Sequence, residues 1–319
     1  MPTVVAHGEL LIDFVPTVSG VTLLEAPAFI KAPGGAPANV AVGLARLGVS
    51  AGFMGQVGDD VFGRFLAQTL RDQGVDVSAL RFSKDARTML AFVSLRSDGE
   101  RDFVFYRHPS ADMLYAPAHV DPAYVRAARV FHFGSISLIS EPACAATLYA
   151  VDVARAAGVL VSYDPNLRLG LWPSAEAARA GVQRAWALAH FIKVSEEELT
   201  FLAGTDDPEK AVDILWHPDL RLLVVTCGRA GCRYITSRFS GEVPGFSVNV
   251  VDTTGAGDGF VAGLLKGLLD NLDALDREPQ LRAICRYANA VGALTTTLRG
   301  AIPALPTAVA VQMFLEVEE

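Results

Sequence analysis

Short apolar runs alternate with helix-like segments along most of the chain, and this alternation constrains the fold more than any other feature. Three helix-like segments, at 37–47, 61–73 and 142–157, each end at a glycine. A glycine there is typical of a left-handed helix cap that leads into a strand. Repeated strand–helix units predict an α/β fold, a three-layer sandwich in which helices cover both faces of a mostly parallel central sheet. A fourth helix is expected at 175–189, and the expected strands are Val4–His7, 51–57, Val130–Phe133, 159–163, 191–194, Leu222–Thr226 and 233–236.

Two stretches interrupt this alternation. Residues 10–32 carry few helix signals, and residues 87–106 alternate apolar and polar side chains around the turn S-D-G-E at 97–100, which is typical of a hairpin. We expect the two stretches to form a small β-sheet lid whose apolar face closes over a ligand or pairs with another subunit. Because no linker or repeat is evident, 1–319 is expected to be a single domain with its lid at about 10–32 and 87–106.

Charge and cysteine usage exclude several classes of protein. The formal net charge is −8 and no Lys/Arg run occurs, so no nucleic-acid partner is expected. The apolar stretches are too short to span a membrane, and the N-terminus lacks the features of a signal peptide. Four cysteines without a C-x-x-C pair suggest neither a disulfide framework nor a zinc site. We therefore expect a soluble, cytoplasmic protein without a membrane partner.

The most informative segment is V-D-T-T-G-A-G-D-G-F at 251–260, a glycine-rich turn that runs into an apolar helix expected at 260–269. Glycine backbone N–H groups and a helix N-terminus suit the charge on a transferring phosphoryl group. Asp258 stands at the start of that helix and could accept the proton of an attacking hydroxyl. The same pattern also fits an ordinary turn with Asp258 as N-cap, and the pattern alone leaves both interpretations open. The segment is neither a Walker A loop nor part of a protein-kinase signature.

Two separate segments resemble the signatures of one family. Segment 252–258 (D-T-T-G-A-G-D) is similar to the C-terminal signature of the ribokinase-like (PfkB) carbohydrate kinases, and segment 33–41 (P-G-G-A-P-A-N-V-A) to their N-terminal signature. The resemblance covers nearly the whole chain. Within the family the chain is most similar to the fructokinases, on the segments G-E-L-L-I-D-F (8–14), F-Y-R-H-P-S-A-D-M-L (105–114), Y-D-P-N-L-R (163–168) and K-V-S-E-E-E-L (193–199).

This resemblance implies an ATP-dependent sugar kinase, with D-fructose converted to D-fructose 6-phosphate. Kinases for 2-keto-3-deoxygluconate and aminoimidazole riboside share much of the pattern and remain alternatives. A sugar- or nucleotide-binding protein on the same fold is the non-enzymatic alternative. The presence of Asp258 beside an intact Gly-Ala-Gly favours the kinase.

The resemblance also assigns roles at the reacting end of the site. Asp258 would be the catalytic base, and the anion hole would be formed by the backbone of Gly255, Ala256 and Gly257. The residues expected to hold the sugar are Asp13, Gly34, Gly35, Asn39, Arg107 and Arg168. Without the resemblance, the residues themselves favour a lid hinge at the paired glycines and a helix-start residue at Asn39. Arg107 could equally be a solvated lid residue.

Nucleotide and metal contacts follow from the same resemblance. Nucleotide contacts are expected from Thr226, Gly228, Gly231 and Asn289. The first three could otherwise form an ordinary hairpin turn, and Asn289 could be an amide on a helix surface. Glu198 would lie near Mg²⁺ through water, although Ser195 replaces the asparagine that the family often carries three residues before it. Asp252 and Thr254 would hold a monovalent cation such as K⁺, although Ala304 lacks the side-chain oxygen of many relatives. A homodimer through the lid is the expected assembly.

Overall fold

The computed structural model describes residues 1–18, 20–95 and 101–318. The strands are β1 (Val4–His7), β2 (Leu11–Pro16), β3 (Phe29–Gly34), β4 (Ala51–Gly58), β5 (Leu80–Ser83), β6 (Leu90–Leu95), β7 (Arg101–Tyr106), β8 (Val130–Phe133), β9 (Leu160–Tyr163), β10 (Phe191–Ser195), β11 (Leu222–Thr226), β12 (Gly231–Ile235) and β13 (Ser240–Pro244). The α-helices are α1 (Ala36–Arg46), α2 (Val61–Asp72), α3 (Pro122–Arg126), α4 (Ala143–Ala156), α5 (Ala175–Trp186), α6 (Glu196–Ala203), α7 (Pro208–Leu215), α8 (Ala256–Asp270), α9 (Glu278–Thr295), α10 (Ala301–Ala304) and α11 (Ala308–Val317).

Within the described residues, nine strands form the central sheet in the order β13-β12-β11-β10-β9-β8-β1-β4-β5. Neighbouring strands from β5 to β11 are parallel, and β12 and β13 add an antiparallel hairpin at one edge. The chain builds β4 and β5 on one side of β1 and returns to β8 on the other. This switch of direction places a crevice at the carboxyl ends of β1 and β8, where ligands bind in open α/β sheets.

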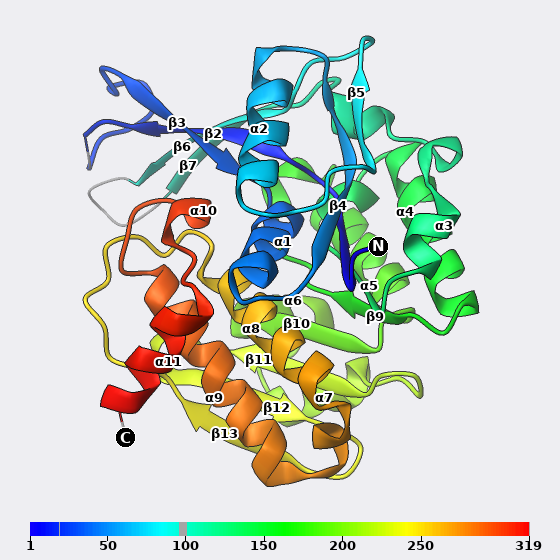
Figure 1. Ribbon diagram of the computed structural model, residues 1–319, viewed down its shortest axis with the longest axis vertical. Helices are drawn as coiled ribbons and strands as arrows, with labels where there is room; N and C mark the ends of the chain where they lie inside the picture. Colours follow the sequence, from blue (N-terminus) through cyan, green and yellow to red (C-terminus); the bar gives the residue numbers. More distant parts are fainter. Residues whose placement is uncertain (19, 96–100, 319) are drawn as a thin grey trace.

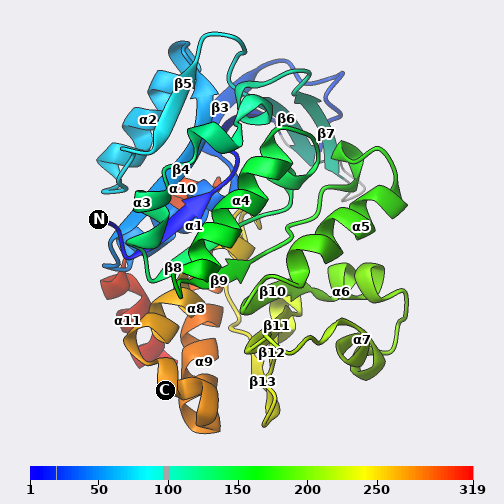
Figure 2. The same ribbon diagram turned by 90° about the vertical axis from the view of Figure 1, so that its right-hand side faces the viewer.

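Helices cover both faces of the central sheet, as the two views show (Figures 1 and 2). Successive side chains of a strand point to opposite faces. In β1, Val4 and Ala6 pack into the core under α1, α2, α8 and α9, whereas Val5 packs into the second core under α3 to α7. The predicted α/β three-layer sandwich with a mostly parallel sheet is confirmed.

A separate sheet projects from one end of the molecule, at the upper left of Figure 1. Its order is β3-β2-β6-β7, with β2 and β6 parallel and the two outer pairs antiparallel. The two stretches that interrupt the sequence alternation therefore form one small sheet apart from the central one. The turn expected at 97–100 lies outside the described residues. That the chain is one domain with this sheet as its lid stays a prediction.

Several details differ from the sequence expectation. Strands β5 and β13 were not predicted, because both lie at sheet edges, where a short strand shows no continuous apolar run. Helix α8 begins at Ala256 rather than at residue 260, since its first turn is the glycine-rich segment itself.

Candidate active site

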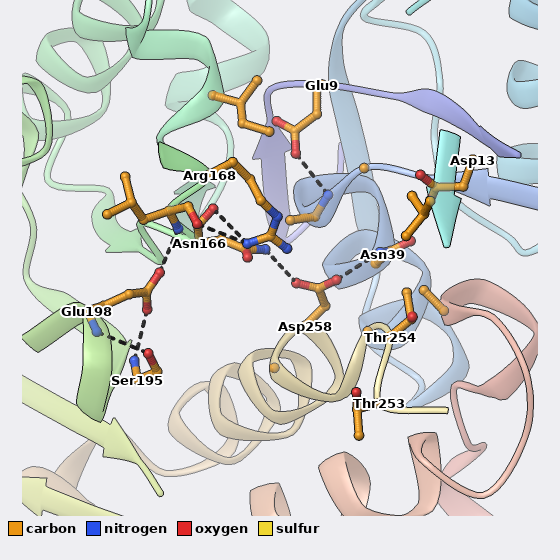
Figure 3. A pocket seen from close by; sticks show the side chains of 18 of the residues that line it. Glu9, Asp13, Asn39, Asn166, Arg168, Ser195, Glu198, Thr253, Thr254 and Asp258 are labelled. Carbon is orange, nitrogen blue, oxygen red and sulfur yellow. Dashed lines mark hydrogen bonds between the residues drawn. The ribbon is translucent and has the colours of Figure 1, made fainter. Parts of the chain in front are cut away.

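A pocket of about 850 Å³ lies between the small sheet and the carboxyl ends of the central strands. Its lining combines Glu9 after β1, Asn166 after β9 and Thr226 at the end of β11 with side chains of the small sheet, such as Asp13 on β2. Figure 3 shows Glu9, Asp13 and Asn166 around the same pocket as Asp258, which lies at the start of α8. The pocket thus occupies the crevice that the strand order creates.

Asp258 is a buried carboxylate in the first turn of α8. Gly255, with a φ of 80°, is the N-cap of this helix, and Asp258 is its third residue. The interpretation of Asp258 as the N-cap is therefore wrong. Burial raises the pKa of Asp258 to about 6, and the hydrogen bond from Asn39 opposes this shift. A carboxylate with a pKa close to neutrality is suited to accepting and releasing a proton.

Two amides hold Asp258 from different elements. Asn39 of α1 donates from Nδ2 to Oδ2 at 2.8 Å, and Asn166 donates from Nδ2 to Oδ1 at 3.4 Å. Both bonds are visible in Figure 3. Each carboxylate oxygen has more than one acceptor direction, so both keep the capacity to accept a further hydrogen bond.

The N-terminus of α8 presents backbone to the same pocket. Gly255 and Gly257 line it, whereas Ala256 is not among the lining residues and donates its N–H to the carbonyl of Thr253 at 3.3 Å. A Cβ at Gly257 would lie 3.0 Å from Nζ of Lys193, which is buried and paired with Asp164 at 3.1 Å. The N-terminus of a helix favours an anion, and the ammonium of Lys193 adds a positive charge here that its pairing with Asp164 partly offsets.

Four of the predicted sugar residues, Asp13, Gly34, Gly35 and Asn39, lie on the segment from β2 to the start of α1. Burial raises the pKa of Asp13 to about 7, and the nearby Arg168 guanidinium opposes the shift. Gly34 makes room for Asp13, because a Cβ there would lie 2.2 Å from its Oδ2. Oδ1 of Asn39 is buried and has no hydrogen-bond partner within the described part of the chain. Gly35, Asn39, Asp13 and Arg168 line the pocket, whereas Gly34 is not among the lining residues.

The two predicted arginines differ in place. Arg168 lines the pocket and donates from Nη1 to the carbonyls of Asn166 and Leu167 at 3.3 and 3.2 Å. Arg107 is 2% exposed and is not among the lining residues. Its guanidinium pairs with Asp112 at 2.9 Å and donates to the carbonyl of Ile136 at 3.1 Å. The structure therefore brings Arg168, but not Arg107, to the pocket.

The predicted nucleotide residues are also divided. Thr226 and Gly228 line the pocket at the end of β11. Gly231 lies outside the lining, where its φ of 108° serves the turn into β12. Asn289 is also outside it and donates from Nδ2 to the carbonyls of Val243 and Pro244 at 3.2 and 3.1 Å.

The predicted metal residues are hydrogen-bonded within the protein. Glu198 accepts from the N–H of Leu167 at 2.6 Å and of Ser195 at 2.9 Å, and Ser195 caps α6 in return. Asp252 accepts from Thr254 at 2.7 Å and from the N–H of Gly300 at 2.9 Å. In the described ranges, no group of three or more His, Cys, Asp and Glu side chains is placed to hold an ion by itself.

Asn166, Lys193 and Glu9 are among the lining residues that had no predicted role. Asn166 and Lys193 belong to segments that carry the resemblance, so the signal was in the sequence, but no pattern showed that they face Asp258. Glu9 is 3% exposed, accepts from the N–H of Ala36 at 2.9 Å, and has its pKa raised by burial to about 7. It holds the start of α1 against the end of β1.

A comparison with protein-family models identifies the family of the chain. The model of the pfkB family carbohydrate kinases matches residues 1–308. The chain belongs to this family. The recognition from the two signatures is confirmed. The family and its fructokinase members identify the chain as a sugar phosphotransferase. This pfkB kinase is 58% identical over 315 residues to probable fructokinase-7 of Arabidopsis thaliana, which covers 98% of this chain and 92% of the relative.

Solved structures of the family are similar throughout. A fructokinase with bound ATP from Xylella fastidiosa is 36% identical, with a TM-score of 0.92 over 100% of this kinase and 99% of that chain. A double-mutant fructokinase from Vibrio cholerae O395, in a fructose, ADP and potassium ion bound form, is 38% identical. Its TM-score is 0.89 over 99% of this kinase and 98% of that chain.

Proposed function

We propose that this pfkB kinase is a fructokinase that transfers the γ-phosphoryl group of ATP to the 6-hydroxyl of D-fructose. The observation that carries the proposal is the buried carboxylate of Asp258, which lies in the pocket beside the N-terminus of α8. The fructokinase relative from Arabidopsis and the fructose and ADP in the Vibrio structure support the choice of sugar and nucleotide.

The proposed step is a direct transfer. The acceptor hydroxyl of the sugar loses its proton to Asp258, its oxygen forms a bond to the γ-phosphorus, and the bond from that phosphorus to the leaving oxygen of ADP breaks. The N–H groups of Gly255 and Gly257, which line the pocket, are the proposed anion hole for the charge on the transferring group. Ala256 stays a prediction, because its N–H already donates to the carbonyl of Thr253. Lys193 adds a positive charge beside Gly257.

The remaining sugar hydroxyls are assigned to the lid side. Oδ1 of Asn39 lacks a partner within the described chain and would accept from a hydroxyl, while Asp13 would take an adjacent one. Arg168, in the pocket lining, is the cation that would contact sugar or phosphate. Arg107 stays a prediction without a place in that lining.

On the nucleotide side, Thr226 and Gly228 are the proposed contacts, because both line the pocket. Gly231 and Asn289 stay predictions without a place in it. Magnesium is proposed to bind through the nucleotide phosphates, with water between it and Glu198, whose oxygens each already accept one backbone N–H. Bound there, Mg²⁺ would offset the charge of the phosphates.

The oxygens of Asp252 and Thr254 suit a hard monovalent cation such as K⁺, since ligation by oxygen is what such ions prefer. The potassium ion in the Vibrio structure supports this choice.

We further propose one domain with the small sheet as lid, a homodimer through that sheet, and a cytoplasmic location. Within the described residues, no helix has both the length and the apolar character to cross a bilayer.

A coupled assay of ADP release over a sugar panel tests the proposal. The panel is fructose, glucose, ribose, 2-keto-3-deoxygluconate and aminoimidazole riboside. Fructose should give the highest kcat/KM, because unpaired polar groups in the site reject sugars that lack the matching hydroxyls. A rival sugar that exceeds fructose by about tenfold, or about 1.4 kcal/mol in transition-state binding, would refute the choice of substrate.

A further inference from the structure

Asn166 has an unusual backbone conformation beside the proposed base. Among the described residues it is the only non-glycine residue with a positive φ, at 43°. This left-handed region is unfavourable for most side chains and is tolerated best by asparagine and aspartate after glycine. Residues held in such conformations concentrate at functional sites. The conformation therefore needs a local cause and raises the question of what it achieves.

The cause is a set of hydrogen bonds around the loop after β9. The N–H of Asn166 donates to Oδ1 of Asp164 at 3.1 Å, and Asp164 is fixed in turn by its buried ion pair with Lys193. On the other side, Nη1 of Arg168 donates to the carbonyl of Asn166 at 3.3 Å. Both backbone groups of Asn166 are thus held.

The result is that the side-chain amide of Asn166 points at Asp258, as Figure 3 shows. Its Nδ2 lies 3.4 Å from Oδ1 of Asp258, on the oxygen opposite to the one that Asn39 contacts. The two amides come from the β9 loop and from α1, so together they define the plane of the carboxylate. Donation to the ionised form favours it over the protonated form.

We propose that Asn166 is a positioning residue for Asp258, which orients the carboxylate toward the acceptor hydroxyl and keeps it ionised and ready to take the proton. This inference rests on the proposed role of Asp258 as base. The charged groups that act on Asp258 are Asp164 and Arg168 after β9, Lys193 on β10, and Asp13 on β2, and Asp13 is in turn affected by Asp252 before α8. Asn166 and Asn39 are the neutral donors among these charges.

The test uses Asn166→Gly, which keeps the left-handed backbone and removes the amide. Loss of a donor to the ionised form should move the acid limb of the kcat profile to higher pH. The loss of kcat should be about three- to tenfold greater at pH 6 than at pH 8, the size expected for one hydrogen bond. KM for fructose and ATP should change little, and the melting temperature should stay near that of the wild type.

Two further variants make the result specific. Asn166→Asp keeps the shape but adds a carboxylate beside Asp258, so its acid limb should lie at higher pH than that of the glycine variant. Asn271→Gly is the matched control, because it removes an amide that donates to Gln280 at 2.9 Å at the far end of α8. Its pH profile should match the wild type.

The outcomes separate this inference from the proposed function. If Asp258→Asn is inactive while both Asn166 variants keep the wild-type pH profile, the positioning role is overturned and the base stands. A rise in KM for ATP alone would also overturn it and make Asn166 a nucleotide contact. Near-normal turnover of Asp258→Asn would overturn the base and the inference together.

Discussion

The buried charge of Asp258 should cost the folded protein stability. Burial raises its pKa from 3.8 to about 6, so the folded state binds this proton more tightly than the unfolded state. Stability therefore falls as pH rises from about 4 to about 6, and the loss is complete above that range. About two pKa units at about 1.36 kcal/mol each correspond to about 3 kcal/mol at neutral pH.

Asp258→Asn should consequently lose activity and gain stability. Removal of the general base should lower kcat by about 10²–10⁴-fold. The unliganded variant should melt at a higher temperature than the wild type at pH 8, and the difference should shrink at pH 4.5. Calorimetry at the two pH values and the ADP-release assay measure both effects.

Asp270→Asn is the control for this prediction, because it lies on the same helix with an exposed side chain paired to Lys266. Asp270→Asn should leave kcat unchanged and should change the stability by no more than a surface ion pair contributes, about 0–1 kcal/mol. An Asp258→Asn variant that melts lower than the wild type at pH 8 would contradict the cost assigned to the buried charge.

At the scale of elements, the sequence predicted the central strands well because periodicity and glycine caps mark them directly. The expected strand Val4–His7 matches β1, and the expected strand at 51–57 is β4 with one residue added. The start of α8 was misplaced, since Ala256 and Gly257 read as a turn, not as a helix. The place of Asp258 in the pocket was predictable from its signature, and its role as the base stays a prediction. The sequence did not predict that Asn166 and Lys193 lie close to the first turn of α8, because this depends on how the ends of separate strands are arranged in the sheet.

The first turn of α8 offers a matched pair of glycine variants. A methyl at Gly257 would meet only the flexible end of Lys193 at 3.0 Å, whereas one at Gly255 would lie 2.6 Å from Cβ of Ala301, on a backbone with φ of 80°. Gly257→Ala should therefore fold normally but lose activity, since its methyl enters the proposed anion hole. Gly255→Ala should also lose stability, by at least about 1–2 kcal/mol for the left-handed conformation.

Melting temperatures and kcat/KM of the two variants separate these effects. Gly170→Ala is the control, because a Cβ there meets nothing within 4 Å. Full activity in Gly257→Ala would argue against an anion hole at this turn.

At the scale of the whole molecule, the small sheet exposes apolar side chains that lie outside the pocket. Ile30 is 61% exposed and lies opposite Val15 in the antiparallel register of β2 and β3. Directly paired residues share a face of the sheet, and Val15 lines the pocket. The pocket-facing side of the sheet therefore continues as an exposed apolar surface, which such a sheet needs to cover.

Ile30→Glu should therefore weaken the proposed homodimer, because a charge would be buried where the two small sheets meet. We expect sedimentation velocity to show a dimer for the wild type and a larger monomer fraction for the variant at equal concentration. KM for fructose should rise in parallel, since the lid would lose its support above the pocket.

Val104→Glu is the matched control. Val104 is 46% exposed, and it lies with its strand partner Phe92 on the face of the small sheet that points away from the pocket. If Val104→Glu dissociates the protein and Ile30→Glu does not, association uses the outer face. A monomeric wild type at micromolar concentration would refute the homodimer while leaving the kinase assignment intact.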